Sequence, residues 1–191
     1  VVEYGRKKGV DLIMHHETSS AVTTYEQQLD TAFALMQSLG LHTVKTGYVG
    51  TIIPKGEYHH GQWMVNHYRR VLETAAKYKI AVNVHEPFMA TGERRTYPNF
   101  ISQEGFRGQE FNAWSTDGGN PPSHHTIIPF TCLLAGPMDY TPGIFNIKLK
   151  PYKPNNQAVL RAHVEEQGQG AQPVCRAGRQ AARLSAAGGL I

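Results

Sequence analysis

The sequence predicts an α/β fold, a partial (β/α)8 barrel of the TIM type, on three observations. Short apolar segments alternate with longer segments of helical period, which is the pattern of parallel strands joined by crossover helices. The predicted strands start near residues 10, 42 and 80, a spacing close to one strand–helix unit of a barrel that holds eight units in roughly 250 residues. Each predicted strand is also followed directly by polar, reactive side chains.

Three strands are expected, at residues 10–16, 42–47 and 80–85. Each is short and mostly apolar, as the strands of a buried parallel sheet are.

Two helices connect these strands. The first is expected to begin at a capping box, in which the side chains of Thr24 and Gln27 bind each other's free backbone amides. Apolar residues then recur at steps of three and four until Gly40 ends the helix. The second helix is expected from about residue 61 to residue 79, with apolar side chains on one face.

The first nine residues resemble the last turn of a helix that ends at Gly9. We therefore expect that a preceding part of the protein is absent from this chain. These residues lack the apolar stretch of a signal peptide, and the chain has no apolar run of membrane-spanning length.

The regular alternation stops after the third strand. Residues 87–123 form a long Gly- and Pro-rich stretch, and a loop of this length inside a domain is usually functional. A buried helix is expected at residues 126–135, although Pro129 interrupts it. Residues 136–140 are expected to form a strand or an extended turn.

The end of the chain differs in composition from the rest. From about residue 157, Ala, Arg, Gly and Gln dominate and no apolar period is sustained. Disorder and a translation frameshift both explain this composition, and we favour the frameshift. We therefore assign residues 1–156 to part of a catalytic barrel and residues 157–191 to an aberrant or disordered tail.

Composition excludes several classes of function. With 40% hydrophobic and 18% charged residues, the chain reads as an ordinary globular protein. Its formal charge of +4 comes from scattered basic residues without a stripe of stacking aromatics, so nucleic acid is not an expected partner. The two cysteines form no Cys-x-x-Cys motif, which argues against a thiolate zinc site.

Reactive side chains stand at the ends of all three predicted strands. The first ends in His15 and Glu17, the second contains Lys45, and the third ends in His85 and Glu86. The carboxyl ends of parallel strands meet at one rim of a barrel, where substrates bind. Each residue alone could simply face solvent, but three such termini in succession predict one shared cleft.

The long loop adds Glu104 and Glu110. Alone, such loop glutamates are usually surface charges. Together with Glu17 and Glu86 they would bring four carboxylates to one rim. Glycoside hydrolysis needs a carboxylic acid and a second carboxylate, and calcium needs several oxygen ligands. Both chemistries fit this set, and they can coexist.

Other catalytic motifs are absent. The histidines occur in adjacent pairs, such as His15 and His16, whose side chains point to opposite faces of a strand and cannot easily share one zinc ion. There is no His-Glu-x-x-His motif, no Gly-x-Ser-x-Gly elbow and no Gly-rich phosphate loop before either helix.

Six segments resemble glycoside hydrolase family 97 in sequence and order. They are His15–Thr18, Thr43–Gly50, Asn83–Glu86, Arg95–Asn99, Arg107–Glu110 and Gly136–Gly143. The resemblance covers roughly residues 1–156. It implies a (β/α)8 catalytic barrel between an N-terminal β-sandwich and a C-terminal β-domain, neither of which is in this chain. It also implies hydrolysis of α-linked oligosaccharides, calcium (Ca2+) as cofactor, and a periplasmic or cell-surface location.

The resemblance also assigns roles to individual residues. In the inverting branch of the family, Glu110 matches the general acid, and Glu17 and Glu86 match the general base. Glu86, Glu104 and Glu110 match the calcium ligands, with a further ligand normally supplied by the β-sandwich. His15, Lys45 and His85 match positions that contact sugar.

The retaining branch places an aspartate nucleophile where this sequence has Gly47. Glycine cannot attack an anomeric carbon and leaves room for the water that inversion requires. The resemblance therefore implies a calcium-dependent inverting α-glucosidase. The alternatives are a retaining α-galactosidase of the same family, or a catalytically inactive fragment or sugar-binding remnant.

Overall fold

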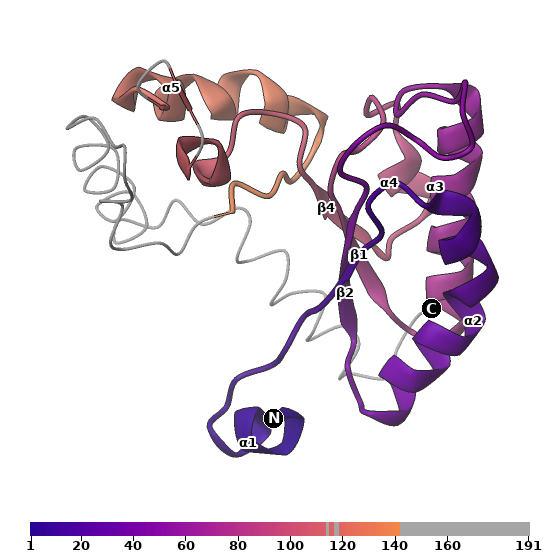
Figure 1. Ribbon diagram of the computed structural model, residues 1–191. Helices are drawn as coiled ribbons and strands as arrows, with labels where there is room; N and C mark the ends of the chain where they lie inside the picture. Colours follow the sequence, from indigo (N-terminus) through magenta and orange to yellow (C-terminus); the bar gives the residue numbers. More distant parts are fainter. Residues whose placement is uncertain (114, 117–118, 142–191) are drawn as a thin grey trace.

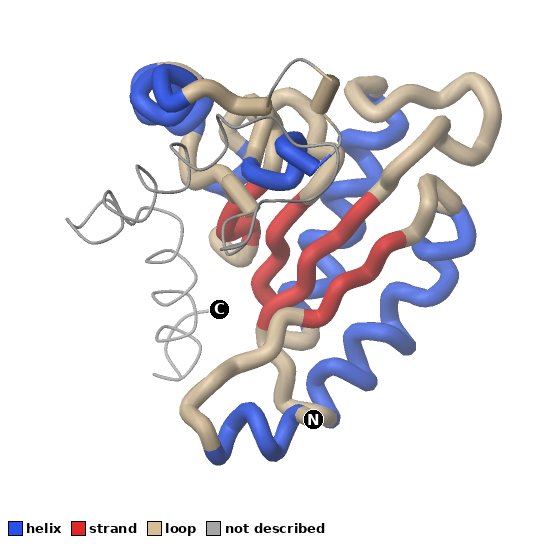
Figure 2. The backbone as a smooth tube through the Cα atoms, turned by 60° about the vertical axis from the view of Figure 1, so that its left-hand side comes forward, coloured by secondary structure: helices blue, strands red, loops and turns tan. Residues whose placement is uncertain are grey.

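Four parallel strands form one sheet in the order β1-β2-β3-β4. In the computed structural model, which describes residues 1–113, 115–116 and 119–141, they are β1 (Met14–Glu17), β2 (Thr43–Gly47), β3 (Ala81–Val84) and β4 (Phe100–Gln103). Each strand pairs in parallel with the next one along the chain, as in a barrel wall (Figure 2). The predicted α/β barrel fragment is thereby confirmed.

Two long helices cover one face of this sheet (Figure 1). They are α2 (Val22–Ser38) and α3 (Gln62–Lys77). The shorter helices are α1 (Val2–Lys7), α4 (Glu93–Thr96) and α5 (Pro122–Ile127), and three 3-10 helices lie at Gln109–Ala113, Ile128–Phe130 and Cys132–Ala135. Within the described part of the chain, no helix is both long and apolar enough to cross a membrane.

The core lies between α2, α3 and the sheet. On α2 the buried residues Tyr25, Leu29, Phe33 and Met36 recur every three or four positions, so they form one stripe of the helix. Helix α3 presents an equivalent stripe, which consists of Met64, His67, Tyr68, Val71, Leu72 and Ala75. Each large apolar side chain buried in this way contributes roughly 1.5–3 kcal/mol to stability.

Helices α1, α2 and α3 end in the same backbone motif, and strands β2 and β3 follow the last two. After α2, the N–H of Gly40 donates to Gln37 O and the N–H of Leu41 donates to Met36 O. These are the two bonds of a Schellman motif, and the positive φ of 64° at Gly40 permits the turn. Lys79 takes the same place after α3 with a φ of 57°. The predicted end of α2 at Gly40 is confirmed.

The start of α2 differs from the prediction. The helix begins at Val22 after Ala21, and no side chain caps it. Ala21 forms a bridge with Ile53 and its carbonyl accepts the N–H of Tyr25. This tertiary contact starts the helix two residues before Thr24, which lies inside the first turn. The predicted capping box is therefore wrong.

The segment after Glu86 is also more regular than predicted. It contains α4 and β4, so the long loop was wrong for residues 93–96 and 100–103. The single helix predicted at residues 126–135 is replaced by the end of α5 and two 3-10 turns, the first of which contains Pro129. Residues 136–140 are extended and include a parallel bridge from Met138 to Gln103. The predicted tail at 157–191 lies outside the described residues.

Candidate active site

The carboxyl ends of the four strands bring the predicted site residues to one rim. The register pairs Glu17 of β1 with Gly47 of β2. Beyond the ladder, the N–H of His85 donates to Thr46 O and the N–H of Glu104 donates to Val84 O. These bonds fix the height of each strand end relative to its neighbour. Glu104 belongs to this rim because it follows β4, the strand that the sequence pattern did not reveal.

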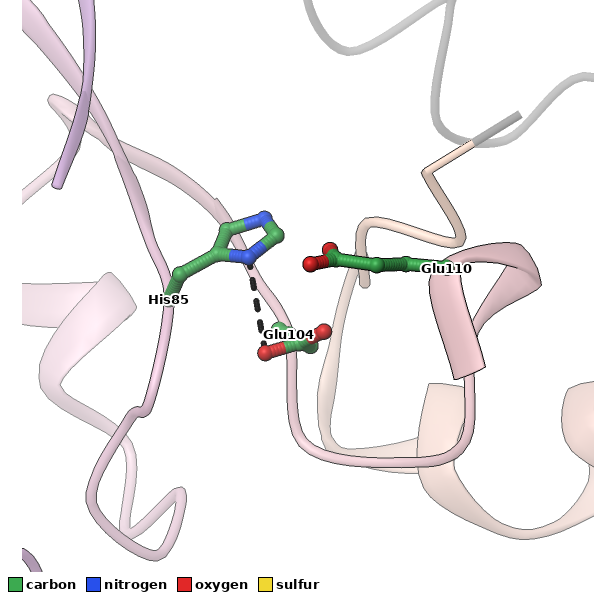
Figure 3. A group of neighbouring side chains, drawn as sticks. All are labelled: His85, Glu104 and Glu110. Carbon is green, nitrogen blue, oxygen red and sulfur yellow. Dashed lines mark ion pairs between the residues drawn. The ribbon is translucent and has the colours of Figure 1, made fainter. Parts of the chain in front are cut away.

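His85, Glu104 and Glu110 converge at the centre of the site (Figure 3). One potential ligand atom of each lies within 4.8 Å of the others. His85 Nδ1 is 3.4 Å from Glu104 Oε2. Glu110 comes from the 3-10 helix at Gln109–Ala113, and its backbone N–H donates to Thr141 Oγ1 at 3.1 Å. Two carboxylates and one imidazole therefore share a small volume.

Asp139 is a site residue that sequence reasoning missed. Its carboxylate accepts bonds from His85 Nε2 at 2.8 Å, from Asn83 Nδ2 at 2.6 Å and from the N–H of Thr141 at 2.9 Å. Asp139 lies in one of the segments that carry the family resemblance, but its place beside His85 depends on the pairing of Gln103 with Met138. An acidic residue directly after an extended segment was the available clue.

The two carboxylates beside His85 set its protonation state. Burial acts to lower the pKa of His85, but hydrogen bonds to Asp139 and Glu104 outweigh burial and raise the pKa to about 9. Burial likewise acts to raise the pKa of Asp139, and the bonds from His85 and Asn83 overcome it and lower the pKa to about 2. His85 is therefore an imidazolium at neutral pH, with each ring nitrogen donating to a carboxylate.

Glu86 is held through both its backbone and its side chain. Its φ of 46° is unusual for a residue with a side chain, and the hydroxyl of Tyr68 donates to its carbonyl. Its Oε2 accepts the backbone N–H of Tyr48 at 2.8 Å. Burial raises the pKa of Glu86, and the charges of Glu104 and Glu17 add to this rise against the bond from Tyr48.

Glu17 fills the space above the end of β2. Its Oε1 accepts the N–H groups of Ser19 at 2.9 Å and Val49 at 3.3 Å. A Cβ added to Gly47 would lie 2.0 Å from Glu17 Oε2, a distance that no side chain tolerates. Glycine at position 47 is thus what allows Glu17 to lie across the neighbouring strand.

His15 and Lys45 lie at the same rim. His15 Nε2 is 3.8 Å from Glu17 Oε2. Burial lowers the pKa of His15, the charge of Lys45 lowers it further, and Glu17 and Glu110 oppose this. The charges of residues from three strands and the following 3-10 helix thus act on one another. All seven predicted site residues lie at this rim, and Glu86 faces Tyr48 rather than the tight group of His85, Glu104 and Glu110.

Comparison with known families agrees with this geometry. The sequence model of the family Glycoside hydrolase 97 matches residues 1–106, more than half of the 191-residue chain. This chain belongs to glycoside hydrolase family 97. The family prediction is confirmed.

Two curated relatives are similar over most of this chain. A probable retaining alpha-galactosidase of Streptomyces bingchenggensis is 29% identical over 157 residues. A retaining alpha-galactosidase of Bacteroides thetaiotaomicron is 27% identical over 143 residues. The alignments cover 81% and 75% of this chain but only 21% and 20% of the relatives. This chain therefore spans about a fifth of their length.

Solved structures place the fold in the same family. A glycoside hydrolase family 97 enzyme from Pseudoalteromonas sp. strain K8 matches with a TM-score of 0.68, at 50% identity in a complex with panose and 51% in a complex with acarbose. Each match covers 76% of this chain and 23% of the other. A beta-arabinopyranosidase matches with a TM-score of 0.57 at 20% identity, which shows a shared fold.

Proposed function

We propose that this rim is the active site of a calcium-dependent, inverting α-glucosidase that uses general acid/base catalysis. One observation carries the proposal: β2 ends in Gly47, and the carboxylate of Glu17 occupies the space where a side chain at position 47 would stand. A retaining glycosidase needs a carboxylate that attacks the sugar, whereas an inverting enzyme needs a base that activates water on the face opposite the leaving group. The end of β2 has no such nucleophile.

In the proposed mechanism, Glu110 donates a proton to the oxygen of the departing group. The backbone N–H of Glu110 donates to Thr141, and its carboxylate points toward His85 (Figure 3). Glu17 and Glu86 orient the attacking water and accept its proton. The raised pKa of Glu86 suits this role, because a base titrating closer to the working pH accepts a proton more readily.

His15, Lys45 and His85 are proposed to bind the sugar. The imidazolium of His85 keeps its charge at neutral pH because Asp139 and Glu104 bind it. Because both ring N–H groups of His85 bind carboxylates, its positive charge would act on the sugar electrostatically rather than through a further donated hydrogen bond. It also reduces the repulsion between the surrounding carboxylates.

The donor set also fits a calcium ion. Glu104 and Glu110 offer carboxylate oxygens close together, and Glu86 binds Tyr48 through Oε2, so its Oε1 is the oxygen that would face the ion. Oxygen is the ligand that calcium prefers, so carboxylates rather than the imidazole of His85 would be the ligands. Glu86, Glu104 and Glu110 would hold the ion, which would neutralise these carboxylates and fix their positions.

Two alternatives rest on specific observations. The curated relatives at 29% and 27% identity are named as retaining alpha-galactosidases, which favours a galactosidase. This chain also spans only about a fifth of those relatives, which favours a sugar-binding remnant or an inactive fragment. The Pseudoalteromonas structures at 50% and 51% identity were determined with panose and acarbose, and this greater similarity supports the glucosidase.

Hydrolysis followed by NMR distinguishes these functions. Panose, an aryl α-glucoside and an aryl α-galactoside are incubated with the chain and calcium, and the anomer of the first sugar released is recorded. Release of β-glucose supports the inverting glucosidase, and release of α-galactose replaces it by the retaining galactosidase. Binding without turnover leaves the sugar-binding remnant.

The acid role has its own test in Glu110→Gln. We expect at least a roughly 100-fold loss on panose and a smaller loss on an activated aryl glucoside, because a good leaving group needs less protonation. Glu3→Gln in α1 is the matched control, since Glu3 is exposed and far along the chain from the rim. An equal loss on both substrates would remove Glu110 from the acid role.

A further inference from the structure

A chain of three hydrogen bonds runs from the helical layer to Glu86. It starts on α2, where Glu26 Oε1 is 2.7 Å from His67 Nδ1 of α3. His67 Nε2 is 2.8 Å from the hydroxyl of Tyr48. The backbone N–H of Tyr48 then donates to Glu86 Oε2 at 2.8 Å. His67 and Tyr48 are completely buried, and Arg70 binds the outer end of the chain at Glu26.

The partners fix the direction of each bond. Burial acts to raise the pKa of Glu26, but bonds from Arg70 and His67 overcome it and lower the pKa, so Glu26 is ionised and can only accept. His67 must therefore carry its proton on Nδ1. Burial lowers the pKa of His67 to about 4, so its Nε2 is unprotonated at neutral pH and accepts a hydrogen bond from the Tyr48 hydroxyl.

Tyr48 connects the buried His67 to Glu86 at the rim. It is the first residue after β2, and the segment from there to α3 contains no helix or strand of its own. Its ring packs edge-on against Tyr68 at a centroid distance of 5.3 Å, and Tyr68 donates to the carbonyl of Glu86. The two tyrosines thus hold Glu86 from opposite ends, one through the carboxylate and one through the backbone.

We propose that Glu26, His67 and Tyr48 form a positioning relay, which fixes the backbone amide of Tyr48 against the carboxylate of Glu86. They are positioning residues because none of them belongs to the proposed catalytic or sugar-binding set, and they act through Glu86. The relay deepens the hydrolase function proposed above and rests on it only for its catalytic consequence. The hydrogen-bonded connection itself is independent of turnover.

A buried histidine and a buried tyrosine need hydrogen-bond partners in any fold. A test of the relay must therefore distinguish it from hydrogen bonds that only pair such buried groups. The chain offers a matched pair for this purpose. The buried hydroxyl of Tyr25 lies 2.9 Å from His16 Nδ1. Tyr25→Phe and Tyr48→Phe each remove one buried hydroxyl that contacts a histidine. Of these two tyrosines, Tyr48 is the one that contacts Glu86.

A double-mutant cycle tests the connection. The folding equilibrium constant is measured by urea denaturation for Tyr48→Phe, Glu86→Gln and the double variant, and again with Tyr25→Phe in place of Tyr48→Phe. We expect a coupling of roughly 3- to 30-fold between positions 48 and 86, in the range of contacting groups, and less than about twofold between positions 25 and 86. Equal couplings in the two cycles overturn the relay.

Amide exchange provides a second measurement if a buried variant does not fold. Glu26→Ala changes a partly exposed side chain, and we expect exchange of the residue 48 amide to accelerate by about tenfold while the Val44 amide in β2 stays unchanged. Glu73→Ala is the control, because Glu73 is likewise a helical glutamate, on α3, whose carboxylate accepts a side-chain hydrogen bond, from the hydroxyl of Tyr97. Unchanged exchange at residue 48 overturns the relay.

Kinetics separate the relay from the hydrolase function. If the chain hydrolyses a glucoside, Tyr48→Phe should lower kcat about tenfold with little change in KM, and Tyr25→Phe should leave both within twofold. Equal kcat values for the two variants overturn the relay and leave the hydrolase standing. A positive cycle in a chain without turnover supports the relay and counts against the hydrolase function of this chain.

Discussion

Gly47→Ala is the substitution that most directly tests the arrangement of Glu17. A Cβ at position 47 would lie 2.0 Å from Glu17 Oε2 and 2.9 Å from its Cδ. The end of the Glu17 side chain is the part that can move, so we expect its carboxylate to be displaced by about 1–2 Å, as ordinary packing distances require. That displacement breaks its bonds with the N–H groups of Ser19 and Val49.

The expected magnitudes differ sharply between stability and activity. The two lost bonds cost about 1–2 kcal/mol at a side chain that is 35% exposed. Alanine offsets about 0.4–1 kcal/mol of this by restricting the unfolded chain, because the φ of Gly47 is not positive. The net loss of stability is therefore small. A catalytic group misplaced by about 1 Å can cost roughly 100-fold in rate.

The assay combines urea denaturation with hydrolysis of panose and an aryl α-glucoside in calcium. Gly56→Ala is the matched control. Its Cβ would meet nothing within 4 Å, but its φ of 100° makes alanine unfavourable. Gly56→Ala should lose stability and keep activity, whereas Gly47→Ala should keep most stability and lose activity. Full activity in Gly47→Ala would refute the placement of Glu17 as a base.

Three further predictions concern calcium binding, the loss of stability at acid pH and the pKa of His85. Glu104→Gln should weaken calcium binding in calorimetry by at least about tenfold, while Glu3→Gln should not; equal affinities would remove Glu104 from the ligand set. The pKa of His67 is lowered to about 4 in the folded protein, so as the pH falls the unfolded chain binds this proton first. The free energy of unfolding should therefore fall by about 3 kcal/mol between pH 6.5 and pH 4. The urea midpoint of His67→Asn should fall less steeply over this range, and an identical slope would contradict the burial argument. Asp139→Asn should bring the pKa of His85 down from about 9 toward 6.5 in an NMR titration, and an unmoved pKa would contradict the role of Asp139. A raised pKa of His85 stabilises the folded protein fully below pH 6.5, and this contribution is lost as the pH rises through 9. The variant should therefore lose stability most at neutral and acid pH.

Elements with a strong local pattern were predicted well. The helices α2 and α3 and the strands β2 and β3 lie within a few residues of their predicted ranges, because apolar period and the turn at Gly40 are local properties. Strand β4 was missed, since its residues 100–103 follow Pro98 and include Ser102 and Gln103. Both polar side chains are buried, and Ser102 donates to Asn83 Oδ1 at 2.8 Å. That partner lies 19 residues away.

The sequence by itself determined which side chains reach the rim. Parallel strands end at one edge, so polar residues after the predicted strands had to meet there, and Glu17 and Glu86 do so. The tertiary structure alone decided how these groups act on one another. The bond from Tyr48 to Glu86 spans 38 residues and that from His85 to Asp139 spans 54. Protonation and orientation arise from such distant contacts and from burial, which no local pattern of residues specifies.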